Sequence, residues 1–262
     1  MMKKTILMVI IAFTFVLKLN AQKVEFRQLE NKAFGVGEKL TFDVKYGFVT
    51  AGIATMEIPK IKRISGRDSY YIAFKVNSVP SFDPFYKVRD SYITYLDTAG
   101  LFPWRFEQHI REGKFKKDFS AFFDQRKEKV KTSKGQYEIN RYVNDIVSAF
   151  YYFRTLDYKD KEIGHTFILE NFYQNKTYPL KVVYHGRETV SVEAGTFDCI
   201  MIEPVIEEGG LFKSEGTIVV WMTDDDLRMP VKVKTKILIG SIDAELTKYE
   251  GLKNPTLSLH KD

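Results

Sequence analysis

Residues 144–156 are the one stretch of the chain with helical periodicity, and strand-like segments flank this stretch on both sides. Its apolar residues at the i, i+3, i+4 and i+7 positions of one face are Ile146, Ala149, Phe150 and Phe153. Asn144 or Asp145 can cap the first turn, and Arg154 is placed to pair with the negative end of the helix dipole. Because further apolar side chains continue around its sides, we expect this helix to be covered by protein on most of its circumference.

The segments around this helix alternate apolar and polar residues with the two-residue period of a β-strand that is buried on one face. Glycine-containing turns separate most of them, including Thr50-Ala51-Gly52 and His185-Gly186-Arg187. The predicted strands are 38–48, 53–58, 70–78, 86–96, 102–111, 115–123, 127–132, 136–140, 166–171, 177–184, 188–192, 196–204, 215–222, 230–235 and 241–249. The pattern predicts a mainly β fold, in which a large curled antiparallel sheet, roll or barrel-like, packs around one central helix.

The N-terminal residues have the form of a secretory signal peptide. Two lysines precede a short apolar run, and the segment ends at Ala21, a small residue suited to a cleavage site. Cleavage after Ala21 removes three lysines and no acid, so the formal net charge falls from +6 to about +3. Gln22 follows the cut where a lipoprotein needs cysteine, so we expect a periplasmic or secreted product with no lipid anchor and no transmembrane segment. We expect one all-β domain at residues 22–253 and a polar tail at 254–262.

The amino-acid composition narrows the possible classes of protein further. Hydrophobic residues make up 44% of the chain and aromatic residues 15%, which is typical of a globular protein. The single cysteine, Cys199, excludes an intrachain disulfide, and it shares a predicted strand face with Phe197 and Met201, which indicates a buried thiol. Acidic residues interrupt the densest basic runs, and together with export this argues against nucleic acid as a partner.

Four segments carry a resemblance to a known family. They run from Gly37 to Val44 with Ala51-Gly52, from Asp145 to Arg154, from Val192 to Cys199, and from Trp221 to Val231. In these segments, in this order, the chain resembles the bacterial envelope family catalogued as domain of unknown function 3108. The resemblance implies an exported Gram-negative protein with a curled antiparallel β architecture. It implies no established reaction and no catalytic residues.

Two aromatic segments, 82–89 and 102–106, suggest a binding site. Tyrosine and tryptophan rings can stack on sugars or line acyl chains, and an arginine can pair with an anionic headgroup. The candidate ligand-binding residues are Tyr86, Arg89, Tyr92, Trp104 and Arg105. The alternative is that these rings fill the interior of the sheet, since a roll of this size needs large side chains inside.

Catalytic and metal-binding patterns are weak. The four histidines are scattered without metal-ligand spacing, and no glycine loop for a cofactor phosphate is present, so we expect no metal and no cofactor. The run Asp224-Asp225-Asp226 has oxygen ligands suited to Ca²⁺, but it lacks the spacing of a calcium loop and is better explained as a turn in which Arg228 holds Asp226. Asp97-Thr98-Ala99 fits a short O-glycosylation pattern, which makes Thr98 a hypothetical acceptor.

Three function classes remain. The leading hypothesis is a non-catalytic periplasmic protein that binds an envelope lipid, glycan or outer-membrane protein. The second is a hydrolase of envelope glycans that uses paired carboxylates, either Glu107 with Asp118 or Asp224 with Asp226. The third is a structural partner of an outer-membrane assembly, which a large exposed apolar patch would mark.

Overall fold

The computed structural model describes residues 25–205, 217–237, 240–253 and 258–259. The predicted signal peptide therefore lies outside the described residues. The strands are β1 (Lys39–Tyr46), β2 (Val49–Ile64), β3 (Arg67–Ser78), β4 (Arg89–Asp97), β5 (Pro103–Glu112), β6 (Phe115–Asp124), β7 (Lys129–Thr132), β8 (Gly135–Glu138), β9 (Thr166–Tyr173), β10 (Lys176–Val192), β11 (Gly195–Pro204), β12 (Ile218–Thr223), β13 (Pro230–Lys236) and β14 (Ser241–Glu250).

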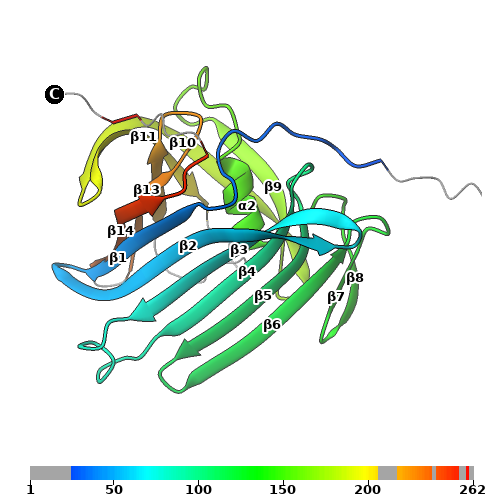
Figure 1. Cartoon of the computed structure of the whole chain (residues 1–262), viewed down its shortest axis with the longest axis horizontal. Coiled ribbons are helices and arrows are strands. Elements are labelled where there is room, and N and C mark those ends of the chain that lie inside the picture. The colour runs from blue at the N-terminus through cyan, green and yellow to red at the C-terminus, as the bar shows by residue number, and fades with distance from the viewer. Residues whose placement is uncertain (1–24, 206–216, 238–239, 254–257, 260–262) are drawn as a thin grey trace, which may run out of the picture.

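All fourteen strands form one antiparallel sheet. Its order is β8-β7-β6-β5-β4-β3-β2-β1-β14-β13-β12-β11-β10-β9, so strands that are consecutive in the chain are neighbours in the sheet except β8 and β9, and the pairing of β1 with β14 joins the two halves. The sheet curls around the helix α2 (Ile146–Phe153) (Figure 1). It is not closed, because β8 and β9 are its two edges. The predicted fold class is confirmed.

Two predicted turns are wrong. His185-Gly186-Arg187 lies inside β10, where the register with β11 shifts between Tyr184 and Gly186, so the glycine forms a bulge instead of a reversal. Thr50-Ala51-Gly52 lies inside β2, because the chain already reverses at the turn 47–48, where Gly47 has a φ of 59°. A glycine with positive φ serves a bulge and a turn equally well, so the local sequence did not separate them.

Helix α2 is held between the two halves of the curled sheet. The Asp145 side chain accepts hydrogen bonds from the backbone N–H groups of Val147 and Ser148, which confirms the predicted cap. Val147 and Tyr151 pack in a large cluster to which both halves of the sheet contribute, β1–β7 on one side and β9–β11, β13 and β14 on the other, whereas Ala149 and Phe153 pack in a second cluster with residues of β10–β12. Among the described residues no helix is both long and apolar enough to cross a membrane.

The predicted core face of the helix is partly wrong. Ala149 and Phe153 are buried, but Ile146 and Phe150 are only half-buried. Two clusters cover opposite sides of the helix, so burial follows those sides and not a single stripe. The stripe that contains Ile146 and Phe150 keeps part of its surface exposed.

Arg154 is not a partner of the helix dipole as expected, because its side chain forms a fully buried ion pair with Glu38. Its Nη1 and Nη2 atoms donate to the two carboxylate oxygens of Glu38 at 2.7 and 2.8 Å. The guanidinium also donates to the carbonyl oxygens of Ala33 and Leu227. The pair therefore ties the end of α2 to the chain before β1 and to the turn before β13.

One end of the curled sheet, with the β2–β3, β4–β5 and β6–β7 turns, is packed shut, and we call it the sealed end. Its core is an aromatic cluster of Phe26, Phe102 and Trp104, all buried. The buried Asp97 accepts hydrogen bonds from Trp104 Nε1 at 3.0 Å and from Arg67 Nη2 at 2.8 Å. The N-terminal segment thus closes this end of the interior.

Asp145 gives a pH-dependent stability that can be measured. Burial raises the pKa of this carboxyl from 3.8 to about 6, although hydrogen bonds from Thr94 and Ser148 oppose the shift. Between these pH values the folded state holds a proton that the unfolded state has lost, so stability falls as pH rises. We expect the free energy of unfolding to fall by roughly 2–3 kcal/mol from pH 4 to 7 through this group. Urea unfolding across this range measures the change, and Asp145→Asn must remove this group's share of the pH dependence.

Candidate ligand-binding site

The inward-facing side chains become more exposed toward one end of the sheet. Along the inner face of β6, Phe123 and Ala121 are buried, Phe119 is half-buried and Phe115 is exposed. The same progression runs from Leu40 to Tyr46 along β1 and from Trp104 to Glu112 along β5. The interior therefore opens to solvent at the end that carries the β1–β2 turn and the β3–β4 and β5–β6 connections, which we call the open end.

The wall of the open end is apolar. Several strands and α2 contribute side chains that pack on the main core and still keep exposed surface, namely Val44, Phe74, Val76, Tyr92, Phe119, Ile146, Phe150 and Ala244. The helix reaches this wall because Asp145 accepts a hydrogen bond of 2.6 Å from Thr94, the next inward residue of β4 after Tyr92. Ile146 and Phe150, in the first two turns after this contact, pack on the main core and are half-exposed.

A few polar groups lie among these apolar side chains. Gln108 is 4% exposed, and among the described residues its Oε1 atom has no hydrogen-bond partner. Its register partner Tyr92 has a pKa raised to about 12, by burial first and then by Asp90. Lys117 Nζ donates to the hydroxyl of Tyr173 at 3.3 Å, which joins β6 to β9. An acceptor and a cation are therefore available to a bound molecule.

Two carboxyl groups meet near the mouth of the open end. The pKa of Glu112 is raised, by burial first and then by its neighbour Asp90, which also hydrogen-bonds to it. Asp90 accepts a hydrogen bond of 2.8 Å from the backbone N–H of Arg111, and the Tyr86 hydroxyl donates to Glu112 at 3.5 Å. Repulsion from the Asp90 carboxylate thus favours the protonated form of Glu112.

The family model described as "Protein of unknown function (DUF3108)" matches residues 41–247, most of the curled sheet together with α2. The chain belongs to the DUF3108 family. No protein with a curated description matches this DUF3108 chain.

Two solved structures resemble this DUF3108 protein. One is the beta-barrel-like protein of domain of unknown function DUF1849 from Brucella abortus, with 11% identity and a TM-score of 0.53, covering 82% of this chain and 97% of that chain. The other is the hypothetical protein CT021 from Chlamydia trachomatis, with 7% identity and a TM-score of 0.38, covering 87% of this chain and 93% of that chain. The first likeness shows a shared fold.

The DUF3108 fold does not bring the five predicted ligand-binding residues together. Tyr86, Arg89 and Tyr92 lie at the open end, where Arg89 Nη2 donates to Asp83 at 2.6 Å and fixes the β3–β4 connection. Trp104 is buried at the sealed end. Arg105 is on the outer face, where it pairs with Glu107. Two differences of position separate these residues, since Trp104 lies at the other end of its strand and Arg105 points to the other face of the sheet.

The predicted carboxylate pairs lie outside the open end. Glu107 and Asp118 are on the outer face, where Asp118 accepts from Arg111 at 2.8 Å and contacts His109 at 2.7 Å. In the acidic run, Asp224 pairs with Arg187 at 2.6 Å and Arg228 lies 3.6 Å from Asp224, so the expected pairing of Arg228 with Asp226 is wrong.

Asp225 organises the turn that follows β12. Its side chain accepts hydrogen bonds from the backbone N–H groups of Leu227 and Arg228. It also accepts a hydrogen bond from the Thr223 hydroxyl at 2.7 Å. The described part of the chain holds no cluster of three or more His, Cys, Asp or Glu side chains that is placed to bind a metal.

Other predicted residues have local roles. Cys199 is buried, as expected, and burial followed by the nearby Asp198 raises the pKa of its thiol to about 12. Thr98 lies in the β4–β5 turn and donates to the carbonyl oxygen of Asp68 at 3.2 Å, and its glycosylation stays a prediction.

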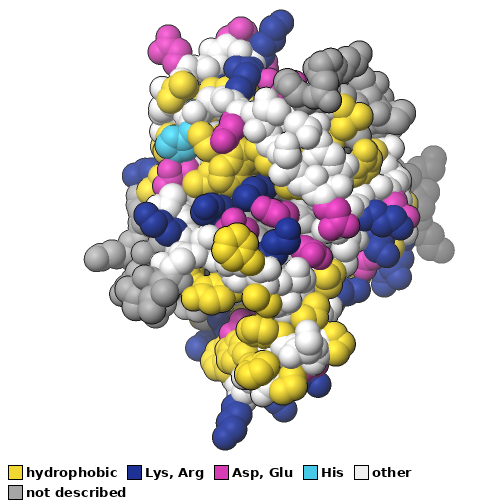
Figure 2. Space-filling view, turned by 90° about the vertical axis from the view of Figure 1, so that its left-hand side faces the viewer, with side chains coloured by type: hydrophobic (Ala, Val, Ile, Leu, Met, Phe, Trp, Pro, Cys, Tyr) yellow, Lys and Arg dark blue, Asp and Glu magenta, His cyan; other side chains and the backbone are white. Residues whose placement is uncertain are grey.

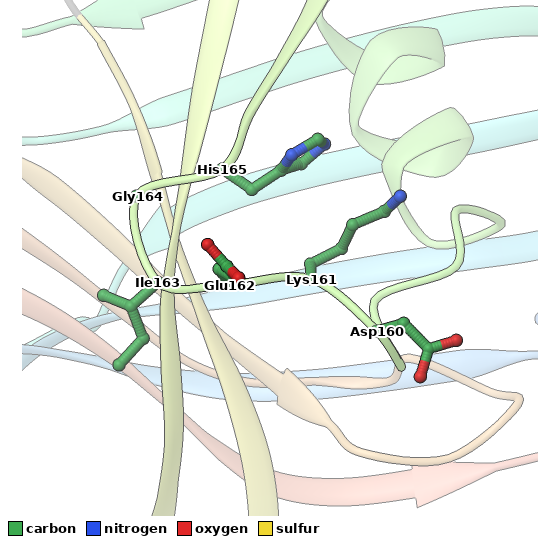
Figure 3. Close-up of a pocket in the computed structure, with 6 residues that line it drawn as sticks. All are labelled: Asp160, Lys161, Glu162, Ile163, Gly164 and His165. Carbon is green, nitrogen blue, oxygen red and sulfur yellow. The ribbon is translucent and has the colours of Figure 1, made fainter.

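A hollow of about 540 Å³ lies against the loop before β9 and is lined by residues 160–165. Figure 3 shows that the side chains of Lys161, Glu162 and His165 point in different directions instead of toward one point. All lining residues come from this single loop. The hollow therefore lacks the convergent polar groups of a binding site, and the open end is the better candidate.

Proposed function

We propose that this DUF3108 protein is an exported, non-catalytic binding protein whose open end takes the apolar part of an amphipathic, lipid-like molecule. The observation that carries the proposal is the half-exposed apolar wall of the open end, since a sheet that only filled its own core would bury these side chains. Export is supported by the signal-peptide pattern of residues 1–21.

The polar groups of the open end suit the other part of such a ligand. Lys117 and Tyr173 lie between the apolar wall and the mouth, where they can bind an anionic headgroup. Gln108 lies deeper and offers an unpaired carbonyl oxygen to a hydroxyl or amide of the ligand. In this arrangement the acyl part extends toward Ile146 and Phe150.

A matched pair of variants on β6 tests the proposal. We expect Phe119→Asp to weaken binding of a fluorescent fatty acid at least tenfold, because it places a charge within the apolar wall. Phe122→Asp is the control, since Phe122 lies on the outer face of the same strand. Equilibrium titration followed by fluorescence measures both affinities, on variants that thermal unfolding shows to be folded.

The result that contradicts the proposal is equal affinity of the two variants, or no binding by the unsubstituted protein. Native mass spectrometry of protein purified from the periplasm is the complementary experiment. A co-purifying lipid supports the proposal, whereas a co-purifying glycan in place of a lipid contradicts it. The same spectrum tests export, because cleavage after Ala21 gives a mature chain that begins at Gln22.

A further inference from the structure

Large apolar side chains stand in solvent on the turns of the open end. Phe48 in the β1–β2 turn is fully exposed, Phe85 in the β3–β4 connection is 82% exposed, and Phe115 beside the β5–β6 turn is 55% exposed. Figure 2, which faces this end of the molecule, shows hydrophobic side chains gathered over its lower part. Folding gains little from these rings, because Phe48 buries no area and most of the surface of Phe85 and Phe115 stays in solvent.

The sheet topology brings these turns together. β1 to β6 form a meander, so the β1–β2, β3–β4 and β5–β6 connections all lie at the same end, although they are far apart in sequence. Scattered exposed apolar residues are normal, whereas a group of them on neighbouring turns marks an interaction surface. We call Phe48, Phe85 and Phe115 the aromatic tips.

Positive charge accompanies the aromatic tips. Lys87 and Lys114 are exposed on the same connections and Lys116 is exposed at the start of β6, and among the residues that the structure describes no ion pair holds these three lysines. The acids nearby are engaged, since Asp83 is bound by Arg89, and Glu112 is hydrogen-bonded to Asp90. The open end therefore presents lysine cations around exposed aromatic rings. This arrangement is complementary to a partner whose surface is negatively charged.

We propose that the open end docks on an anionic lipid bilayer. The aromatic tips insert at the level of the headgroups, and the three lysines bind lipid phosphates. Lysine is depleted at the core of protein–protein interfaces, whereas exposed aromatic rings bordered by lysine are typical of proteins that bind the membrane interface. Separate protruding turns also suit a soft bilayer better than a rigid partner. This docking does not depend on ligand binding inside the sheet.

Vesicle sedimentation with the full chain tests the docking. We expect the unsubstituted protein to bind phosphatidylcholine vesicles that contain phosphatidylglycerol, to bind pure phosphatidylcholine much more weakly, and to dissociate as salt rises. The triple variant Phe48→Ser, Phe85→Ser, Phe115→Ser must lose at least tenfold in partitioning. The triple variant Lys87→Glu, Lys114→Glu, Lys116→Glu must lose at least a hundredfold on the anionic vesicles, because loss of the three lysines alone costs about 1 kcal/mol each and the glutamates add repulsion.

Matched controls come from the loop before β9, at a distance from the open end. Ile163→Ser removes an apolar side chain that is 75% exposed, and Lys159→Glu reverses an exposed charge. We expect the partitioning of both variants to equal that of the unsubstituted protein. Equal losses in the control and tip variants overturn the proposal, as does the absence of binding to anionic vesicles. Self-association in sedimentation equilibrium that the serine variant abolishes also overturns it, because a second copy then covers the tips.

Discussion

Replacing Arg154 with alanine is expected to lower the free energy of unfolding by about 3–5 kcal/mol, because it leaves Glu38 as an unpaired charge in the interior. Both side chains are fully buried, and the guanidinium holds two carboxylate oxygens and two carbonyl oxygens at once. Solvent can replace these bonds only if the structure opens. Urea unfolding followed by circular dichroism measures the loss.

Two further variants establish the cause. The double variant Glu38→Gln, Arg154→Met removes both charges, so we expect it to be more stable than either single variant. Arg105→Ala breaks the half-exposed pair with Glu107 and is expected to cost less than about 1 kcal/mol. If Arg154→Ala is no more harmful than Arg105→Ala, the buried pair does not hold the helix to the sheet.

Replacing Trp104 with alanine is expected to cost about 3–5 kcal/mol of stability and to leave ligand affinity unchanged. The indole is fully buried between Phe26 and Phe102, and its Nε1 atom donates to the buried Asp97. The substitution leaves a cavity and removes one of the bonds that position Asp97. Thermal and urea unfolding measure the stability, and the fatty-acid titration measures the affinity.

The second tryptophan is the control for this experiment. Trp221 is only half-buried, and its Nε1 atom donates to the exposed side chain of Glu188, so Trp221→Ala must cost clearly less stability than Trp104→Ala. A loss of ligand affinity in folded Trp104→Ala protein, with stability near that of the unsubstituted protein, contradicts a purely structural role for Trp104. Such a loss would instead support the ligand-binding role that the sequence suggested for Trp104.

The sheet and the helix were predictable because their signals are local. Alternation along each strand and the capping residue Asp145 depend on residues within a few positions of one another. The pairing of Arg154 with Glu38 was not predictable, since the partners are 116 residues apart. Gly186 was assigned to a turn because a turn and a β-bulge both favour a glycine with a positive φ, so the sequence does not distinguish them.

The site was only partly predictable. Tyr92 and Trp104 are both aromatic, and only their positions along β4 and β5 place one at the open end and the other at the sealed end. Gln108 and Asp90 were missed, although a signal was present. Each is a polar residue in the inward-facing row of its strand, between positions that are otherwise apolar or aromatic. A polar residue in such a row is a useful marker of an interior that is not fully packed.

Cysteine labelling along β6 tests the open interior most directly. The native Cys199 is buried and contributes little background. We expect a maleimide to modify Phe119→Cys at a rate between those of Phe122→Cys, on the outer face, and Phe123→Cys, in the buried core. An amphipathic fatty acid must protect position 119 and leave position 122 unchanged. If position 119 reacts as slowly as position 123, or if the fatty acid gives it no protection, the open apolar interior does not exist as described.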